Sequence, residues 1–222
     1  IFSLFRLPSP KPAPDQAPLG EGDQQAVGNT VGEMIGSVSL LALFLFVYVG
    51  VEVGFGGWIY TYGLQSGLES EATAAYLTSA FWGAFTAGNF LALLLLKLID
   101  SRRILIGATV IAMASLGIAL FAPGNAAVAG FILLGFGISP LWPVIYSLAL
   151  NSVPEHHGAF SGLLVTATVG GAMVPLLIGA VGDLFGLRAG MFILFGCLVY
   201  IAAIGFWAKP LVTNKRLGDK KK

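Results

Sequence analysis

The feature that most constrains the fold is a long stretch of the chain that carries no charge. Between Arg103 and Glu155 the sequence contains no Asp, Glu, Lys or Arg. About 20 consecutive apolar residues suffice to cross the hydrocarbon core of a bilayer as a helix. The stretch is therefore long enough for two crossings, and Pro123-Gly124-Asn125 predicts the tight turn between them.

The composition of the whole chain agrees with a membrane location. The 222 residues are 56% hydrophobic and 10% charged, with a mean hydropathy of +0.85. An ordinary soluble domain carries about 25% charged residues, and glycine, of which there are 30, is commoner in membrane helices than in soluble ones. The chain is thus expected to be an integral, multi-pass, all-α membrane protein with membrane lipid around it and no nucleic-acid partner.

Three regions can be separated along the chain. Residues 1–34 hold five prolines and four acidic residues, which predicts a flexible cytoplasmic linker. Residues 35–208 hold six apolar segments and predict a six-transmembrane-helix bundle, and residues 209–222 form a basic cytoplasmic tail. The six segments run over 35–62, 73–98, 104–121, 127–150, 159–181 and 189–208.

The distribution of Lys and Arg predicts the orientation in the membrane, because cytoplasmic loops near membrane ends are enriched in them. If residues 1–34 are cytoplasmic and the six helices alternate, eleven of the 12 Lys and Arg residues lie inside and Arg188 alone lies outside. Both termini are therefore expected in the cytoplasm, and the plasma membrane is the expected location. The tail from Lys209 is a topology anchor that can also attract anionic lipid.

A short internal repeat suggests how the six helices are arranged. Gly88 is followed twelve residues later by Asp100, with Arg102 and Arg103 next, at the end of the second segment. Gly171 is followed twelve residues later by Asp183, near the end of the fifth segment, with Arg188 five residues further on. These ends lie three crossings apart and hence on opposite membrane faces. The pattern is typical of two inverted three-helix repeats, although ordinary charge placement at helix ends would give it too.

Glu52 lies inside the first apolar segment, in the run Tyr48-Val49-Gly50-Val51-Glu52-Val53-Gly54-Phe55-Gly56-Gly57-Trp58. A carboxylate within a bilayer costs several kcal/mol unless it faces water, a partner or a substrate, so it is a functional hypothesis. The surrounding glycines allow close helix approach, and the indole suits a polar ligand with an apolar face. The alternative is a carboxylate bonded to a neighbouring helix for structural reasons alone.

Other segments combine helix-breaking residues with polar or aromatic ones. Ser139, Pro140 and Pro143 interrupt the fourth segment, and Thr166, Thr168, Gly170, Gly171 and Pro175 form a weak point in the fifth. Interrupted segments point towards the substrate pathway in transporters, although a packing kink would look alike. Shared helix faces are expected for two pairs, Trp142 with Tyr146 and Trp82 with Asn89.

No enzyme constellation is visible. His156 and His157 stand beside Glu155 in a short loop without a further Cys or His, so a zinc site is not expected. A phosphate-binding loop is absent, which argues against an ATP-driven pump. The single cysteine, Cys197, cannot form an internal disulfide. The chain is expected to be no enzyme and to hold no cofactor, apart from Na⁺ or H⁺ as a coupling ion.

Several motifs resemble a known transporter family. They are Phe46-Val47-Tyr48-Val49-Gly50-Val51-Glu52, Tyr76-Leu77-Thr78 with Gly88, Ser139-Pro140 with Pro143 to Leu148, and Gly170 to Pro175 with Gly182-Asp183. Together they resemble the C-terminal six-helix half of the major facilitator superfamily, in its fucose permease-like branch of sugar symporters. The phrase Gly54-Phe55-Gly56-Gly57-Trp58-Ile59 looks most like the animal sodium-dependent glucose transporters of that branch.

The resemblance implies half of a 12-helix fold whose partner is a missing N-terminal six-helix half. The chain begins with Ile1 rather than Met, so a fragment is expected. Family members commonly have Gly-Arg where this chain has Gly88-Asn89, so the cationic role expected there is missing. The acidic and amide residues that the family uses for coupling and sugar recognition lie largely in the other half.

The function expected from these features is cation-coupled symport of a hexose, glucose-like or fucose-like, by alternating access. The alternatives are a transporter for another small organic solute, and a membrane scaffold or sensor without transport. The residues expected to bind the substrate are Glu52, Trp58, Trp82, Asn89, Trp142 and Tyr146. The residues expected to act as gates are Asp100, Arg102, Arg103, Asp183 and Arg188.

Overall fold

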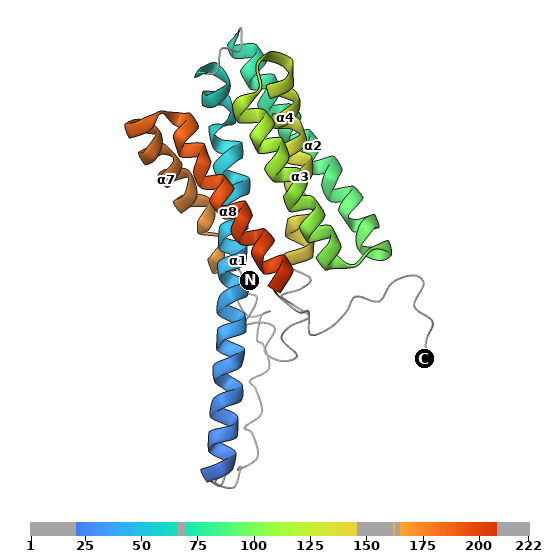
Figure 1. Ribbon diagram of the computed structural model, residues 1–222, viewed down its shortest axis with the longest axis vertical. Coiled ribbons are helices and arrows are strands. Elements are labelled where there is room, and N and C mark those ends of the chain that lie inside the picture. The colour runs from blue at the N-terminus through green and yellow to red at the C-terminus, as the bar shows by residue number, and fades with distance from the viewer. Residues whose placement is uncertain (1–20, 66–69, 146–161, 163–164, 208–222) are drawn as a thin grey trace, which may run out of the picture. The chain divides into compact units, whose positions relative to one another are not determined.

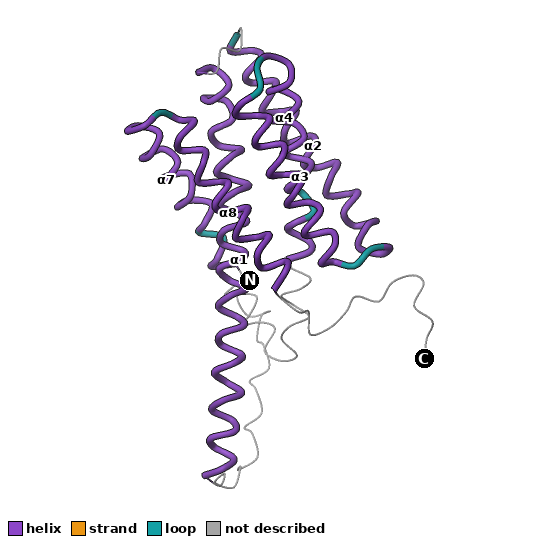
Figure 2. The backbone as a smooth tube through the Cα atoms, in the orientation of Figure 1, coloured by secondary structure: helices purple, strands orange, loops and turns teal. Residues whose placement is uncertain are grey.

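A computed structural model describes residues 21–65, 70–145, 162 and 165–207. Within these ranges the chain is helical and contains no strand (Figure 2). The chain divides into a unit of residues 1–36 and a unit of residues 37–222, which are described separately. Tyr146, the loop with His156 and His157, and the basic tail lie outside the described residues.

The described helices are few and long (Figure 1). Six of them, within the described ranges, are long and apolar enough to cross a membrane, which confirms the predicted all-α membrane fold. Where residues are described, their spans overlap the six predicted segments. The labelled helices are α1 (Glu21–Gln65), α2 (Glu71–Leu98), α3 (Ser101–Phe121), α4 (Gly124–Ile138), α7 (Gly170–Phe185) and α8 (Leu187–Trp207).

In the first unit, residues 21–36 are helical and form the beginning of α1. This differs from the flexible linker that the sequence analysis assigns to residues 1–34. The physical reason is the position of the prolines, which remove a backbone donor and clash with the preceding turn. The last of the early prolines is Pro18, and none follows until Pro123. Nothing therefore blocks the backbone hydrogen bonds of a helix from Glu21 onwards.

In the second unit, α1 supplies much of the buried core. The side chains of Phe44, Tyr48, Val51, Phe55 and Ile59 are almost fully buried and recur every three or four residues. That spacing places them on one face of a helix. Phe55 occupies the centre of this face, with ring centroids 5.3 Å from Phe81 of α2 and 5.5 Å from Phe131 of α4.

The remaining helices pack in two groups around this core. In the first group α2 and α3 both lie along α4, but α2 and α3 contact each other far less. In the second group α7 packs against α8, and Gly186, with φ of +88°, makes the short turn that connects them. The helix α8 also contacts α3, so it connects the two groups.

Two membrane spans are interrupted where the sequence predicts weak points. Helix α4 ends at Ile138, turns at Ser139-Pro140 and resumes as a helix at residues 141–145. The span that contains α7 turns at Thr168-Val169 before α7 begins at Gly170. Pro175, in contrast, lies inside a continuous helix. Broken helices at membrane depth need neighbours or water to satisfy their backbone groups, so both turns are places where polar groups are available.

Carbonyl groups at two helix ends are satisfied by side chains from other helices. Arg102 of α3 donates through Nε to the Gly205 carbonyl at 2.8 Å and through Nη2 to the Phe206 carbonyl, in the last turn of α8. The Tyr62 hydroxyl of α1 donates to the Leu120 carbonyl of α3 at 3.3 Å and accepts from Arg188 Nε at 3.2 Å. The last carbonyls of a helix have no partner within the helix, so these bonds fasten the helix ends to one another.

The Tyr62 connection gives a first prediction about stability. Replacing Tyr62 by Phe keeps the buried ring but leaves the Leu120 carbonyl and the Arg188 donor without this hydroxyl. We expect the free energy of unfolding to fall by about 1 kcal/mol, the usual net value of such a bond. The measurement is the melting temperature in detergent. Tyr60→Phe, at an exposed ring on the same helix, is the control and should melt like the unaltered protein.

Candidate functional site

The candidate site is a cavity of about 380 Å³ among helices of the second unit. Three of its lining residues are ones that the sequence analysis selects, namely Glu52 of α1, Asn89 of α2 and Trp142, which follows the turn after α4. The other lining residues are Val49, Phe85 and Thr168. A carboxylate, an amide, a hydroxyl and an indole therefore come from four different spans onto one surface.

Helix geometry explains why Glu52 reaches this cavity. The core face of α1 carries Tyr48, Val51 and Phe55, and Glu52 stands one position off that face with its side chain half-buried. Val49, three residues before Glu52, lines the same cavity, as expected for neighbours on one helix face. The apolar side of α1 thus packs into the core while its carboxylate borders the cavity.

Asn89 and Thr168 bring hydrogen-bonding groups to the same cavity. The Asn89 amide donates from Nδ2 to the Phe85 carbonyl at 3.1 Å, one turn earlier in α2. An amide carries two donor hydrogens and an acceptor oxygen, so this bond uses part of its capacity. Thr168 lies at the turn that precedes α7, and its hydroxyl donates to the Val165 carbonyl at 2.6 Å. The hydroxyl oxygen keeps its acceptor capacity.

Tyr48 lies behind the cavity lining, in contact with Trp142, and the sequence analysis did not select it. Its side chain is fully buried, and its ring centroid lies 5.9 Å from that of Trp142, which lines the cavity. Its hydroxyl lies near the Glu52 carboxylate and makes no hydrogen bond of ordinary geometry within the described residues. A buried hydroxyl without a partner is costly, so it marks a place where water or a ligand can bind. The signal available in the sequence was its spacing of four residues before Glu52, on the same helix side.

A second cavity, of about 610 Å³, lies between α1 and α7. Trp58 and Asp183 line it, together with Gly57, Pro175 and other residues. The Trp58 indole donates from Nε1 to the Pro175 carbonyl at 3.0 Å, which orients the ring across the face of α7. Trp58 is therefore not in the cavity that holds Glu52, although both residues belong to α1.

The other residues selected from the sequence are more scattered. Trp82 packs edge-on against Phe81 and Phe85, with centroid distances of 5.1 and 5.5 Å, and is absent from the lining of both cavities.

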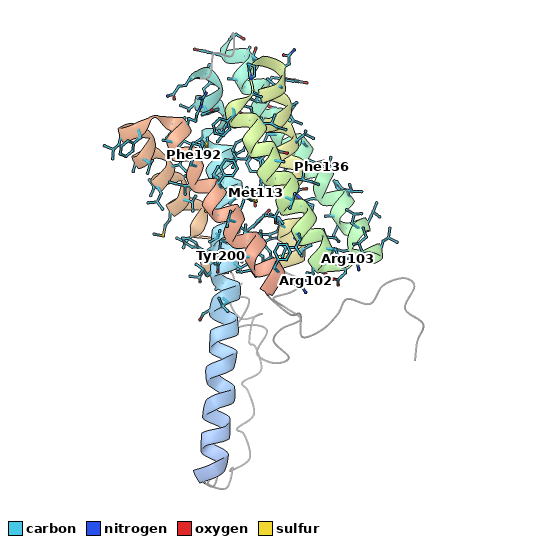
Figure 3. All side chains as sticks on the ribbon, viewed as in Figure 1. Arg102, Arg103, Met113, Phe136, Phe192 and Tyr200 are labelled. Carbon is cyan, nitrogen blue, oxygen red and sulfur yellow. The ribbon has the colours of Figure 1, made fainter. Side chains whose placement is uncertain are left out.

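The residues selected as gates lie apart from these cavities, except Asp183. Arg102 and Arg103 lie at one end of the bundle (Figure 3), where Arg102 binds carbonyls of α8. Asp100 is the N-cap residue of α3. Arg188 binds Tyr62, so it and Asp183 have different neighbours.

These features define a membrane-embedded helical bundle with a cavity that is apolar in part and polar in part. The sequence matches the Major Facilitator Superfamily over residues 1–174. The chain therefore belongs to the Major Facilitator Superfamily, as its motifs predict, and is an integral, multi-pass membrane protein.

Individual relatives narrow the resemblance. The chain is 34% identical over 167 residues to a glucose/galactose transporter of Brucella abortus biovar 1 (strain 9-941). The aligned region is 74% of this chain and 40% of that protein. It is 29% identical over 206 residues to sodium-dependent glucose transporter 1 of Xenopus laevis. Here the aligned region is 91% of this chain and 39% of that protein. The chain thus spans less than half the length of these curated relatives.

A solved structure shows the same fold. The transporter FucP, crystallised in the outward conformation, superposes with a TM-score of 0.74 at 22% sequence identity, over 87% of this chain and 47% of FucP. Together with the two sugar-transporter relatives, this similarity confirms the resemblance to the fucose permease-like branch. The fold is that of one part of a larger major facilitator structure.

Proposed function

We propose that the protein containing this chain transports a hexose across a membrane, by alternating access between this bundle and a second bundle. The observation that carries the proposal is that one cavity is lined by Glu52, Asn89, Trp142 and Thr168. The names of the relatives, a glucose/galactose transporter and a sodium-dependent glucose transporter, give the substrate class.

The chemistry of a sugar suits this cavity. A pyranose has hydroxyl groups that need donors and acceptors, and C–H faces that pack on aromatic rings. Asn89 and Thr168 would bind hydroxyl groups, while Trp142 and Phe85 would cover the apolar ring face. The Tyr48 hydroxyl would gain a partner when water or a hydroxyl of the sugar binds nearby. The polar groups come from different helices, so their spacing depends on how the helices pack.

Glu52 would supply the link to a cation. An isolated charge in a bilayer is expensive, and an intramembrane carboxylate is stabilised when a cation or proton accompanies it. The coupling ion would then be Na⁺ or H⁺, bound at Glu52 while the sugar occupies the same cavity. Both termini would face the cytoplasm of a cell whose plasma membrane holds the protein, in keeping with the Lys and Arg distribution.

Gating would use the charged residues at the helix ends. Asp100, with Arg102 and Arg103, would hold α2 and α3 in one state at the cytoplasmic side, and the bond from Arg102 to α8 would include α8 in this contact. Asp183 and Arg188 would act at the other end of the bundle. Charge pairs near a surface contribute at most about 1 kcal/mol each, enough to bias two states that are close in energy.

This gating proposal predicts the behaviour of Asp100→Ala. We expect initial uptake to fall about two- to fivefold, because the bias between the two states is worth no more than a surface charge pair. Radiolabelled uptake, normalised to the amount of protein at the cell surface, is the measurement. Glu71→Ala, at an exposed acidic residue in the first turn of α2, is the control. Full activity of Asp100→Ala would contradict the gating role of Asp100.

The experiment that tests the function is uptake of labelled glucose and fucose by the full-length protein in vesicles. Each sugar is offered with a sodium gradient, with a pH gradient and with neither. Sodium-stimulated glucose uptake is the expected result, and stimulation by the pH gradient alone would assign H⁺ as the coupling ion. Folded, correctly oriented protein that takes up neither sugar would contradict the proposal and favour another solute or a scaffold or sensor.

A further inference from the structure

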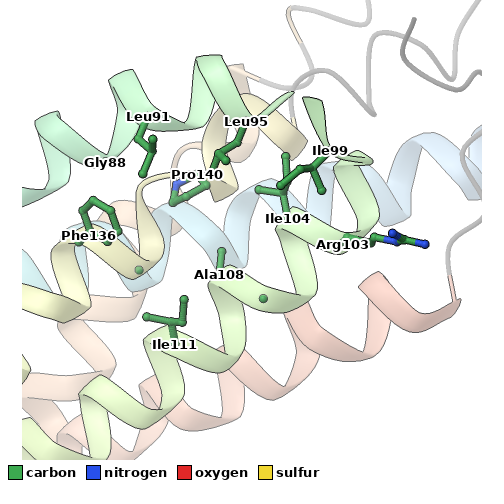
Figure 4. A pocket seen from close by; sticks show the side chains of 12 residues that line it. Gly88, Leu91, Leu95, Ile99, Arg103, Ile104, Ala108, Ile111, Phe136 and Pro140 are labelled. Atoms are coloured by element: carbon green, nitrogen blue, oxygen red, sulfur yellow. The ribbon is translucent and has the colours of Figure 1, made fainter. Parts of the chain in front are cut away.

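A third cavity, separate from the candidate site, lies between α2, α3 and α4 (Figure 4). It has a volume of about 200 Å³ and shares no lining residue with the cavity that holds Glu52. We call it the lipid-side groove. One wall is Leu91 and Leu95 of α2 with Ile99, the residue that caps its end, and the other is Ile104, Ala108 and Ile111 of α3. Its floor is Phe136, Gly137 and Pro140.

The packing of the three helices explains why this groove exists. Both α2 and α3 lie along α4, but they contact each other far less, so a gap remains between them above α4. Small residues keep the gap open. A side chain at Gly107 of α3, for example, would meet no atom within 4 Å. Leu91 and Ile111 on opposite walls are exposed, so the groove is open at the surface of this bundle.

The length of the groove matches one leaflet of a bilayer. Its wall on α3 extends from Arg103 to Ile111, a rise of eight steps along the helix, or about 12 Å at 1.5 Å per step. One leaflet contributes about 15 Å of the hydrocarbon core, half of its 30 Å thickness. A hydrocarbon chain that enters at the Arg103 end would therefore lie in contact with the groove over most of its depth in that leaflet.

The Arg103 end of the groove differs from the rest. The other lining side chains are apolar or glycine, and the Arg103 guanidinium extends from the end of the groove, away from these side chains (Figure 4). Arg103 is exposed, whereas Arg102 beside it is bonded to the α8 carbonyls. Arg103 lies in the first turn of α3, at the start of a candidate membrane span, so its guanidinium is expected near the depth of the lipid phosphates.

We propose that the lipid-side groove binds an anionic phospholipid, with an acyl chain along α2, α3 and α4 and the phosphate group at Arg103. A guanidinium binds phosphate oxygens through two parallel hydrogen bonds, and the apolar walls accommodate the chain. A sugar would find no hydrogen-bond partner on those walls, which excludes a second sugar site there. The proposal is independent of the solute that the protein transports.

Competition between lipids tests this assignment. The full-length protein is purified in detergent, mixed with dioleoyl phosphatidylglycerol and dioleoyl phosphatidylcholine, and examined by native mass spectrometry for the lipid that it retains. We expect phosphatidylglycerol to be retained preferentially. Arg103→Gln should reduce that preference about fivefold, the effect of one basic residue near an anionic surface. Arg103→Lys keeps the positive charge but loses the paired guanidinium donors, so its preference should lie between that of Arg103→Gln and that of the unaltered protein.

Two further variants separate the groove from surface charge and from bulk lipid. Lys97→Gln removes an exposed cation at the same end of α2 but outside the groove, so the preference should persist. Gly107→Leu fills the groove and should lower retention of both lipids, whereas Gly196→Leu, at an equally open position of α8, should not.

Three results would overturn the proposal. One is equal retention of the two lipids by the unaltered protein, which would mean that hydrocarbon fills the groove without recognition of the phosphate. Another is an equal effect of Arg103→Gln and Lys97→Gln, which would mean general surface charge. The third is a dimer that Gly107→Leu converts to a monomer, which would make a second copy of the chain the occupant.

Discussion

Replacing Glu52 by Gln is expected to reduce cation-dependent hexose uptake about 10- to 100-fold. The substitution keeps the size of the side chain but replaces one carboxylate oxygen by an NH2 donor and removes the negative charge, so the cavity would hold sugar without holding the cation. A hydrogen bond or contact to a charged group is worth about 1.5–3 kcal/mol, which corresponds to this range of rates. Initial rates of labelled glucose uptake with and without the sodium gradient provide the measurement.

The position of Glu52 makes the result easy to interpret. Its side chain borders the cavity beside Val49, Phe85 and Trp142 and does not belong to the packed face of α1. Gln at this position should therefore fold as well as Glu. Glu71→Gln makes the same chemical change at an exposed residue and should leave uptake unaltered. Normal surface expression with unchanged cation dependence in Glu52→Gln would remove the central claim about this carboxylate.

The second large effect is expected at Gly170, where α7 crosses α1. A Cβ atom at this position would meet the carbonyl oxygen of Phe46 and would lie 2.7 Å from its carbonyl carbon and 3.0 Å from its Cα. All three are backbone atoms of α1, which cannot rotate aside as a side chain would. The two helices would have to move apart, and overpacking of this kind costs about 1–3 kcal/mol.

Gly170→Ala should therefore lower the melting temperature of the protein in detergent by several degrees, and uptake should fall with it. Thr168, which lines the cavity, stands two residues before Gly170, so a shift of α7 would also displace its hydroxyl. Gly196→Ala on α8 is the matched control, because a Cβ there meets no atom within 4 Å and alanine is the better helix former. Equal melting temperatures for the two variants would contradict the close crossing.

Much of the fold could be predicted from the sequence because the bilayer imposes a simple rule. A backbone in hydrocarbon must satisfy its own hydrogen bonds, so apolar runs of about 20 residues become helices. Prolines could also be interpreted locally: Ser139-Pro140 interrupts a span as predicted, since proline removes a donor whatever its neighbours are. The early start of α1 was missed because acidic and glycine-rich residues outside the membrane give no comparable constraint.

The candidate site was predictable in its residue types and less so in its grouping. An acid, an amide and an aromatic residue inside apolar segments stand out, which is how Glu52, Asn89 and Trp142 were selected. Trp58 stands out equally, but the structure places it with Asp183 in another cavity. Residues six positions apart are separated by about 1.7 turns of helix and so lie on different faces, and the sequence does not say which neighbouring helix each face meets.

The sequence by itself determined the class of protein and the six membrane spans found within the described residues. It also singled out the polar residues inside apolar segments. These properties follow from the free energy of transfer of each residue into hydrocarbon, which depends on the residue and its immediate neighbours. Only the tertiary structure decided which helices lie side by side. It placed Tyr48 against Trp142, turned Arg102 towards α8 and left Arg103 at the end of an open groove. Those outcomes depend on close packing between surfaces distant in the sequence, because lipid leaves no hydrophobic force to select the partners.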